Sequence, residues 1–447
     1  MFRRRLPLAL LAGAVATVAL SACGGVGSSS DSEGGTGTLK TMGFNPGDEV
    51  ATSRVQVFKD QNKKITLKMS KGGFDPQQFL SAVSSGNVPD VVYMDRKDVG
   101  TYAAKGAIQP LDKCISKQHV DTGNFRTPAM QEVTLSGHVY GIPEFYLTRI
   151  VLMSDPVLKQ AGLTADDLST ADWATLSASA KKLSTVSGGK VRRIGFDPKL
   201  PEFLPMWTAA NGASLVTPDG RPNLDDPKVV QALSYAVSLI NEQGGWSAFK
   251  AFRDTWDLFG KKNEIAERQV GAFPWESWYL NVLAEAGSSG DISGTPFLDK
   301  HGRPTTFETG SAWVVPKGAK NPDAACTWVR TMTETSTWMA AAAARQKTVD
   351  KSGEPNTGLY TGNKEADTKI RARYVKPTGK PGLDSAIKAY YTAQDYAVAV
   401  PASRAGSEIN DAWMAAVNRV LTGQQKPAAA MRKAQQDALS AYQSAGN

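Results

Sequence analysis

The chain has 447 residues, 51 Lys or Arg against 43 Asp or Glu, and a formal net charge of +8. A single hydrophobic core stops growing at roughly 250–300 residues, so we expect two or more lobes. The positive excess is small for this length and no run of five basic residues occurs, which gives a nucleic-acid-binding function little support.

The N-terminal residues have the pattern of a secretion signal followed by a linker. Three arginines at positions 3–5 precede the uncharged run 6–20. That run is shorter than the roughly 20 apolar residues of a membrane-spanning helix, so it fits a signal peptide over residues 1–22. A Gly- and Ser-rich stretch follows, and we predict a flexible tether over residues 23–36.

The residues Leu20-Ser21-Ala22-Cys23 resemble the lipobox of bacterial lipoproteins. In that family the peptide is cut before the cysteine, and the thiol then carries a diacylglyceryl group. The resemblance implies that Cys23 is lipidated and anchors the chain to a membrane, since each buried CH2 contributes about 0.8 kcal/mol to attachment. The alternative is a plain signal peptide with a coincidental cysteine.

Strand and helix patterns alternate along the rest of the chain. We predict strands at 38–44, 64–69, 89–95, 150–153, 271–273 and 312–315. We predict helices at 49–62, 76–86, 99–106, 170–184, 227–240 and 322–333, an irregular excursion at 350–367, and two helices between Ile409 and Tyr442. The alternation, and the continuous apolar run from Val91 to Met94, indicate parallel α/β layers.

Motifs for metal, phosphate or nucleophilic chemistry are missing from the sequence. The three histidines are scattered and no CxxC pair occurs, so we expect neither a metal site nor a cofactor. No GxSxG or GxxxxGK[ST] motif occurs, which lowers the expectation of an enzyme. A carboxylate pair for glycoside hydrolysis would nevertheless have no fixed spacing. Cys114 and Cys326 either pair or remain two separate buried thiols.

Four stretches resemble one family in their order and spacing. They are SSGNVPDVVYMD with YAAKGAIQPLD (84–95 and 102–112), GHVYGIPEFYLTRIVLMSDPVLKQAGL (137–163), TGSAWVVPKGAKNPDAACTWVRTMT (309–333) and VLTGQQKPAAAMRKAQQDA (420–438). Together they resemble the bacterial extracellular solute-binding proteins of ABC sugar importers, the family that includes maltose-binding protein. This chain has Met153-Ser154 where the family usually has Tyr-Asn.

The resemblance implies an α/β fold of the periplasmic-binding-protein type. Each of two lobes would be a mainly parallel sheet flanked by helices, with a hinge between the lobes. Lobe one would hold residues 37–145 and 308–345, and lobe two residues 146–307 and 346–447. Cys114 and Cys326 would then both lie in lobe one, which implies a disulfide between them.

The ligand site implied by the resemblance lies in the cleft between the lobes. Sugar hydroxyls require matched polar partners, and the sugar ring faces require aromatic platforms. Asp95 and Arg96 follow a buried strand, where open α/β sheets bind ligands, although Asp95 could instead be a helix N-cap. All ten tryptophans lie after residue 172, and the densest cluster contains Trp275, Glu276 and Trp278.

Further candidates come from the crossing segment and from positions that match ligand-facing loops of the family. They are Asn45, Glu144, Tyr146, Trp207, Gly310, Ser311 and Trp313, with a core position as the alternative for Trp207 and Trp313. Other tryptophans lie on apolar helix stripes, and we expect them in the core: Trp173, Trp328, Trp338 and Trp413.

The implied function is binding rather than catalysis. The lobes would close on a sugar or oligosaccharide and deliver it to the permease subunits of an ABC transporter. The protein would act as a monomer, anchored through Cys23 on the extracellular face of the cell membrane. One alternative is a lipid-anchored glycoside hydrolase that uses Asp95, Glu144 or Glu276. Another is the same fold with a peptide, polyamine or phosphorylated ligand.

Overall fold

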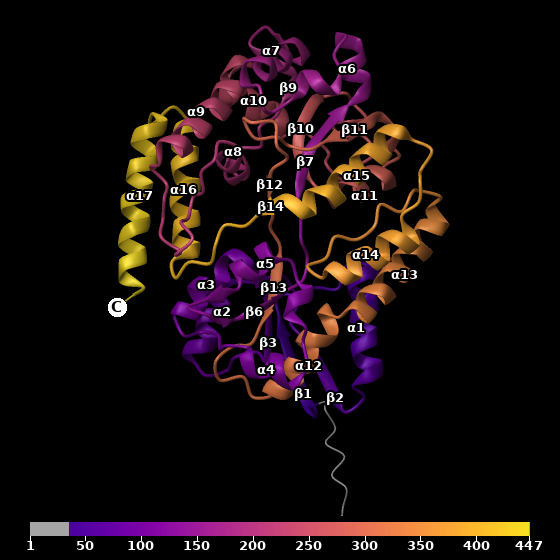
Figure 1. The fold of residues 1–447 in the computed structure, drawn as a ribbon, viewed down its shortest axis with the longest axis vertical. Helices are drawn as coiled ribbons and strands as arrows, with labels where there is room; N and C mark the ends of the chain where they lie inside the picture. The colour runs from indigo at the N-terminus through magenta and orange to yellow at the C-terminus, as the bar shows by residue number, and fades with distance from the viewer. Residues whose placement is uncertain (1–34, 447) are drawn as a thin grey trace, which may run out of the picture. The chain divides into compact units, whose positions relative to one another are not determined.

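A computed structural model of the chain describes residues 35–446 (Figure 1). The predictions of a signal peptide and of lipidation at Cys23, with nearly all of the tether, lie outside the described residues. The described part contains two five-stranded sheets, each covered by helices, which confirms the two-lobed α/β class.

The first lobe is built on a sheet with strand order β2-β1-β3-β13-β6. Its strands are β1 (Gly37–Met42), β2 (Ile65–Met69), β3 (Val91–Asp95), β6 (Gly141–Pro143) and β13 (Ser311–Val314). Successive strand residues point to opposite faces. Val91 and Trp313 therefore enter one core cluster, whereas Val92 and Val314 enter another on the other face of the sheet.

Helices from distant parts of the chain cover this sheet. Asp48 caps α1 by accepting a hydrogen bond from the backbone N–H of Ala51, and Asp75 caps α2 in the same way through Gln78. The helices are α1 (Glu49–Gln61), α2 (Pro76–Ser84), α3 (Arg96–Ala104), α4 (Asp112–Lys117), α5 (Thr127–Glu132), α12 (Pro322–Thr333) and α13 (Thr335–Ser352). The helix predicted at 322–333 is confirmed with these bounds.

The second lobe is built on a sheet with strand order β11-β7-β10-β9-β8. Its strands are β7 (Arg149–Ser154), β8 (Thr185–Ser187), β9 (Lys190–Phe196), β10 (Val270–Glu276) and β11 (Ile292–Thr295). The helices around it are α6 (Asp155–Ala161), α7 (Trp173–Leu183), α8 (Leu204–Ala210), α9 (Pro227–Glu242), α10 (Gly245–Arg253), α11 (Tyr279–Glu285) and α15 (Pro381–Tyr396).

The prediction of mainly parallel sheets is wrong for the second lobe, where only β9 and β10 are parallel. It is half right for the first lobe, where β1 is parallel to β2 and β3 but β13 is antiparallel to β3 and β6. The pair of β8 and β9 is antiparallel because it forms a hairpin, whereas for β7 and β13 the cause is the route of the chain between the lobes. The start of β7 at Arg149 pairs with the end of β10 at Glu276, and the start of β13 at Ser311 pairs with the end of β3 at Asp95. A strand that arrives from the other lobe enters at the carboxyl edge of the sheet, so it runs against its neighbours.

Chain segments pair with one another where they pass between the lobes. The backbones of Leu147 and Thr309 exchange two hydrogen bonds of 2.9 and 3.1 Å. Two short parallel strands, β12 (Thr306–Phe307) and β14 (Ala397–Val398), lie close by. The segment predicted to be irregular is shorter than 350–367, because α13 continues to Ser352 and α14 (Lys364–Tyr374) packs against it, in a cluster that includes Val50 of α1.

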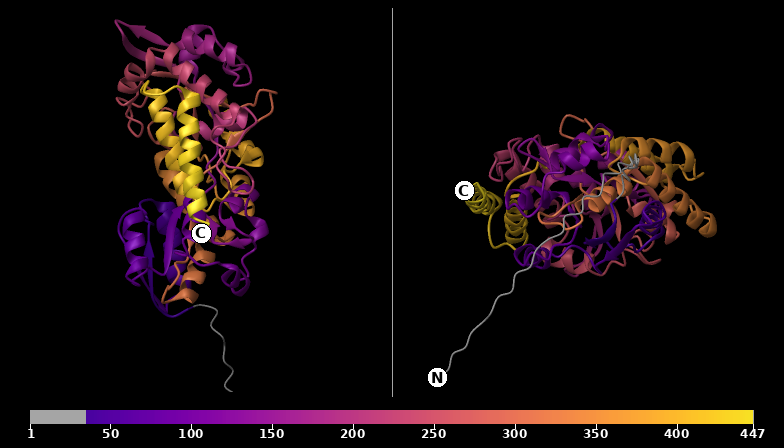
Figure 2. Two further views of the ribbon diagram at one scale, coloured as in Figure 1. Left: turned by 90° about the vertical axis from the view of Figure 1, so that its left-hand side faces the viewer. Right: turned by 90° about the horizontal axis from the view of Figure 1, so that it is seen from below.

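Two antiparallel C-terminal helices, α16 (Gly406–Leu421) and α17 (Pro427–Ser444), lie along both lobes. Both contact α9 of the second lobe, and α16 also contacts α3 of the first lobe. Figures 1 and 2 show the pair in yellow, side by side, running from α9 toward α3.

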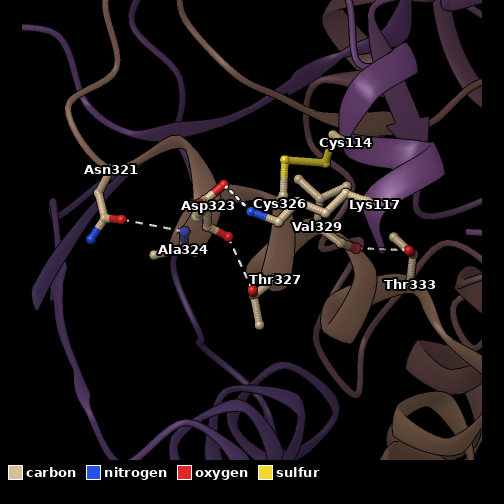
Figure 3. The surroundings of a disulfide bond; sticks show 9 residues. All are labelled: Cys114, Lys117, Asn321, Asp323, Ala324, Cys326, Thr327, Val329 and Thr333. Atoms are coloured by element: carbon tan, nitrogen blue, oxygen red, sulfur yellow. Dashed lines mark hydrogen bonds and ion pairs between the residues drawn. A yellow bond between two sulfur atoms is a disulfide. The ribbon is translucent and has the colours of Figure 1, made fainter. Parts of the chain in front are cut away.

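A disulfide joins Cys114 of α4 to Cys326 of α12, with 5.5 Å between the Cα atoms (Figure 3). Both cysteines are buried in the core cluster that also contains Trp313 and Trp328. The bond therefore ties two helices of the first lobe that lie 212 residues apart in the sequence.

Candidate functional site

A pocket of about 700 Å³ lies where the two lobes and α16 meet. Its volume is within the 300–1,000 Å³ that is typical of small-molecule sites. Most of the lining comes from the second lobe, from α16 and from the segments that pass between the lobes. The first lobe contributes Lys97 at the start of α3 and Glu132 at the end of α5.

One wall of the pocket is aromatic and is built from the end of β10, the turn after it, the loop after α10 and the residue before α8. Trp275 packs against Trp278 and Phe203, with ring centroids 6.2 and 6.1 Å apart. Trp256, from the loop after α10, also lines the pocket. The buried indole N–H groups of Trp275 and Trp256 have no hydrogen-bond partner among the described residues.

A buried lysine supports this wall from one side. The Nζ atom of Lys199 lies 3.8 Å from the ring centroid of Trp275 and 3.2 Å from Oδ2 of Asp197. Burial lowers the pKa of Lys199. Burial raises the pKa of Asp197, but Lys199 and Arg253 outweigh it and lower that pKa overall. The lysine and Asp197 thus hold Trp275 through a cation–π contact.

The facing wall is one side of α16. Gly406, Ile409, Asn410 and Trp413 recur at helical spacing and line the pocket. Trp413 was expected in the core from its helix stripe. The structure places it at the pocket as well, because the stripe that packs on the second lobe continues to the pocket edge.

The floor of the pocket is a network of paired charges. The Arg149 guanidinium donates to the carboxylate of Glu276 and, at 2.8 Å, to the hydroxyl of Thr309. The Arg96 guanidinium donates to Glu132 at 2.5 Å and to Glu308. Burial and the neighbouring Glu132 raise the pKa of Glu308 well above its ordinary value, although Arg96 acts in the opposite direction.

Three of the predicted site residues lie together in the pocket: Trp275, Glu276 and Trp278. Arg96 lies beneath the floor, almost fully buried by its two carboxylate partners, and is absent from the lining. Gly310 allows the close approach that this requires, since a Cβ there would lie 2.2 Å from the carbonyl oxygen of Phe145.

Asp95, Ser311 and Asn45 are also absent from the lining. The side chain of Asp95 is mostly exposed at the N-cap position of α3, where it makes no capping hydrogen bond. It accepts a long hydrogen bond, 3.5 Å, from the hydroxyl of Ser311. Asn45 is exposed in the loop after β1.

The remaining four candidates are buried among protein partners, away from the pocket lining. Glu144 accepts hydrogen bonds from Arg54, at 3.0 Å, and from the indole of Trp313. Trp207 donates from Nε1 to the carbonyl oxygen of Pro198 at 2.9 Å. Tyr146 packs against the guanidinium of Arg126, which lies 5.2 Å from the ring centroid. These contacts account for Glu144, Trp207 and Trp313 without a ligand, whereas the buried hydroxyl of Tyr146 has no hydrogen-bond partner among the described residues.

Sequence reasoning missed most of the polar lining, including Lys97, Glu132, Arg149, Lys199 and Glu308. Arg149 lies within the stretch 137–163 and Glu308 lies directly before the stretch 309–333, both of which carry the family resemblance. Their position next to these stretches was the one signal that could have identified them as site residues. Among residues 35–446, no cluster of His, Cys, Asp or Glu is arranged to hold a metal ion. The same part of the chain contains no helix with the length and apolarity needed to cross a bilayer.

Two mixed α/β lobes, joined by crossing segments and enclosing an aromatic-walled pocket, define the class of two-lobed solute receptors. The chain belongs to the bacterial extracellular solute-binding protein family, whose pattern matches residues 53–349.

Relatives in this family are solute-binding proteins. The chain is 23% identical over 329 residues to the "Maltooligosaccharide ABC transporter solute-binding lipoprotein" of Streptococcus pneumoniae R6, an alignment that covers 69% of this chain and 72% of the relative. It is 24% identical over 331 residues to the "Maltodextrin-binding protein MdxE" of Bacillus subtilis, covering 72% and 75%. A solved structure, "CpMnBP1 with Mannotriose Bound", shares the fold with a TM-score of 0.72 and 22% identity, covering 90% of this chain and 100% of that one.

Proposed function

We propose that the protein is the solute-binding lipoprotein of an ABC transporter, and that it captures a sugar or oligosaccharide and delivers it to a membrane permease. The observation that carries this proposal is the pocket with one wall of tryptophans and one floor of paired charges. The family and the names of the relatives support the same function.

The pocket offers both kinds of contact that a sugar needs. Trp275, Trp278 and Trp413 present flat apolar surfaces to ring faces. Lys97 and Asn410 also line the pocket and present polar groups with which hydroxyls can exchange hydrogen bonds. A hydroxyl-matched site also rejects ligands that lack the hydroxyl, because buried polar groups would then be left unpaired.

The hydrolase alternative has less support. General acid–base catalysis needs a carboxyl group that is free to exchange a proton with the substrate. In the pocket, Glu276 accepts hydrogen bonds from Arg149 and from the Trp278 indole. Glu132 and Glu308 are both held by Arg96. These pairs favour a receptor in which ligand binding shifts the lobes toward a closed state and no bond in the ligand changes.

We further propose that Cys23 carries the lipid anchor, that the protein lies on the extracellular face of the cell membrane, and that it acts as a monomer. For the lobes, we propose a boundary that differs from the sequence-based one. Residues 346–374 belong with the first lobe, because α14 packs against α13 and shares a core cluster with α1. The second lobe then holds residues 146–307 and the chain from about residue 375 onward.

Titration of tryptophan fluorescence with mannobiose, mannotriose, maltotriose, spermidine and a tripeptide tests this function. We expect saturable binding of a saccharide, loss of binding in Trp275→Ala, and little change in the control Trp173→Ala, whose ring stacks on Tyr235 outside the pocket. Recovery of the intact ligand from the complex would support a receptor. Recovery of cleaved sugar would establish the hydrolase, and saturation by spermidine or the peptide alone would refute the sugar assignment.

A further inference from the structure

One of the backbone N–H groups in the first turn of α16 is capped by the other lobe, while those of Ala405 and Gly406 bond to Ser403 just before the helix. A helix begins with four backbone N–H groups that have no partner within the helix. The N-cap position of α16 is Ala405, which has no side chain able to satisfy them. Instead, the N–H of Ser407 donates to Oγ1 of Thr101 at 3.0 Å, and the Ser407 hydroxyl donates to Oδ1 of Asp98 at 2.7 Å. Both acceptors lie on α3 of the first lobe.

Two glycines let the backbones of α3 and α16 approach closely enough for this capping. A Cβ on Gly100 would lie 2.4 Å from the carbonyl oxygen of Ser403, and a Cβ on Gly406 would lie 2.6 Å from the carbonyl oxygen of Lys97. Neither distance is possible for a real side chain, so both positions require glycine.

An ion pair lies at the edge of the same contact. Nζ of Lys105 is 2.8 Å from Oε1 of Glu408, and the Thr101 hydroxyl lies 3.5 Å from the other oxygen of that carboxylate. Both charged side chains are partly exposed, so water screens the pair and it contributes little to the contact. We call the whole contact, residues 97–105 against residues 403–408, the α3–α16 clasp.

The clasp joins the two lobes at the pocket. The second lobe holds α16 through α9, and it holds the residue just before the helix through a 2.6 Å hydrogen bond from Ser403 Oγ to the carbonyl oxygen of Gly220. Lys97 and Gly406, which touch in the clasp, also line the pocket, and Ile409 and Asn410 follow on the same helix. If the lobes move apart, the hydrogen bond from the Ser407 N–H to Thr101 must therefore break. This bond caps the first turn of α16, which is also the start of the pocket wall.

We propose that Thr101 and Gly100 are positioning residues for ligand binding: α3 caps α16 in trans, and this both sets the pocket wall and stabilises the state in which the lobes are together. The proposal rests on the proposed function, since it concerns the same pocket. The ligand does not touch Thr101 or Gly100, which act through α16. Their loss lowers the population of the binding-competent state, and the apparent affinity falls by the same factor.

Conservative variants separate capping from simple packing. Thr101→Val removes the acceptor at nearly constant volume, and we expect about fivefold weaker binding, the size of one lost hydrogen bond, mainly through faster ligand dissociation. Thr101→Ser keeps the hydroxyl and should bind within about twofold of the parent protein. Gly100→Ala should weaken binding about tenfold, because the backbones must separate. Alanine is the better helix former, so a weakened α3 cannot explain that loss.

The matched control is Gly290→Ala in the second lobe. A Cβ there meets nothing within 4 Å, and its backbone is not in the left-handed region. Affinity is measured with whichever saccharide of the fluorescence panel binds, and thermal melts check that every variant is folded.

A second measurement needs no ligand. Spin labels at Ser85→Cys and Ser187→Cys, both exposed and one in each lobe, report the distance between the lobes in the full chain carrying Cys23→Ser. We expect longer or broader distances in Thr101→Val and Gly100→Ala, and parent-like distances in Thr101→Ser and Gly290→Ala. Unchanged distances and affinity in both clasp variants would overturn the proposal. The parent chain could bind no saccharide while Thr101→Val still changes the distance between the lobes. That result would refute the proposed function and support the clasp as the contact that holds the lobes together.

Discussion

Arg54 of α1 and Glu144 form an ion pair in the core of the first lobe, with 3.0 Å between Nη2 and Oε1 and neither side chain more than 1% exposed. The Arg54 guanidinium also lies 4.2 Å from the ring centroid of Trp338, and Glu144 accepts a hydrogen bond from Trp313. The pair therefore joins the first helix of the lobe to the start of the crossing segment. Its role is to hold that segment in place rather than to contact a ligand.

The first prediction follows from this burial. Glu144→Ala should lower the free energy of unfolding by about 3–5 kcal/mol, because it leaves the Arg54 charge buried without a partner. Urea unfolding measures the loss, and calorimetric titration should show unchanged affinity of the folded protein for its saccharide. The comparison variant is Glu276→Ala, which should lower affinity. A Glu144→Gln protein of normal stability and poor affinity would show that Glu144 contacts the ligand.

The second prediction compares a tryptophan that lines the pocket with one that is buried in the core of the first lobe. Trp413 lines the pocket from α16, so Trp413→Ala should weaken saccharide binding by about tenfold or more. Trp328 is fully buried in the first lobe beside Trp313. Trp328→Ala should instead lower the free energy of unfolding by about 3–5 kcal/mol and leave affinity unchanged. The same titration and unfolding experiments decide, and equal affinity losses in both variants would contradict this assignment.

The third prediction concerns pH. Burial raises the pKa of Asp367 to about 6, although Arg126 acts in the opposite direction. Between its ordinary pKa and about pH 6, the folded state then holds more of this proton than the unfolded state. The contribution of Asp367 to stability therefore falls as pH rises through that window, by at most about 3 kcal/mol.

Urea unfolding at pH 4, 5, 6 and 7 tests this sign. The parent protein should lose stability relative to Asp367→Asn as pH rises from 4 to 6, and the difference should level off above pH 6. The constant cost of leaving Arg126 without its carboxylate cancels in the slope, since arginine stays charged throughout. A difference that does not vary with pH would show that the Asp367 carboxyl is ionised throughout the range.

The fourth prediction concerns the disulfide. Thiol titration of the unfolded, unreduced chain carrying Cys23→Ser should find no free thiol, and two free thiols would exclude the bond between Cys114 and Cys326. The double variant Cys114→Ser/Cys326→Ser should unfold with about 2–5 kcal/mol less free energy, since the bond restricts the unfolded chain. Reduction of the parent protein should reproduce that loss.

Local patterns in the sequence were enough to locate many of the elements. The helix from Pro322 to Thr333 could be predicted, because Asn321 and Pro322 form a start signal and the apolar residues recur at helical spacing. Strand direction in the second sheet could not, because it depends on the lobe from which β7 arrives. Trp275 and Trp278 were found from the aromatic cluster that ends β10, where a strand edge meets the pocket.

Glu144 and Trp313 show why the rest of the site was harder to predict. An acidic residue and a tryptophan next to crossing segments have the composition of a sugar site. Their actual partners, Arg54 and each other, lie 90 and 169 residues away in the sequence. No local pattern reveals such a pairing. Glu308 was missed for the same reason, since its partner Arg96 lies 212 residues away in the sequence.

The disulfide between Cys114 and Cys326 also makes a covalent ring of the chain between them. That ring contains β7 to β11 and so the entire sheet of the second lobe, while the first strand of the first lobe and the two C-terminal helices lie outside it. A protease that nicks any loop within the ring cannot release a fragment by a single cut. On a denaturing gel the nicked receptor would still run as one species until a reductant separates the two pieces.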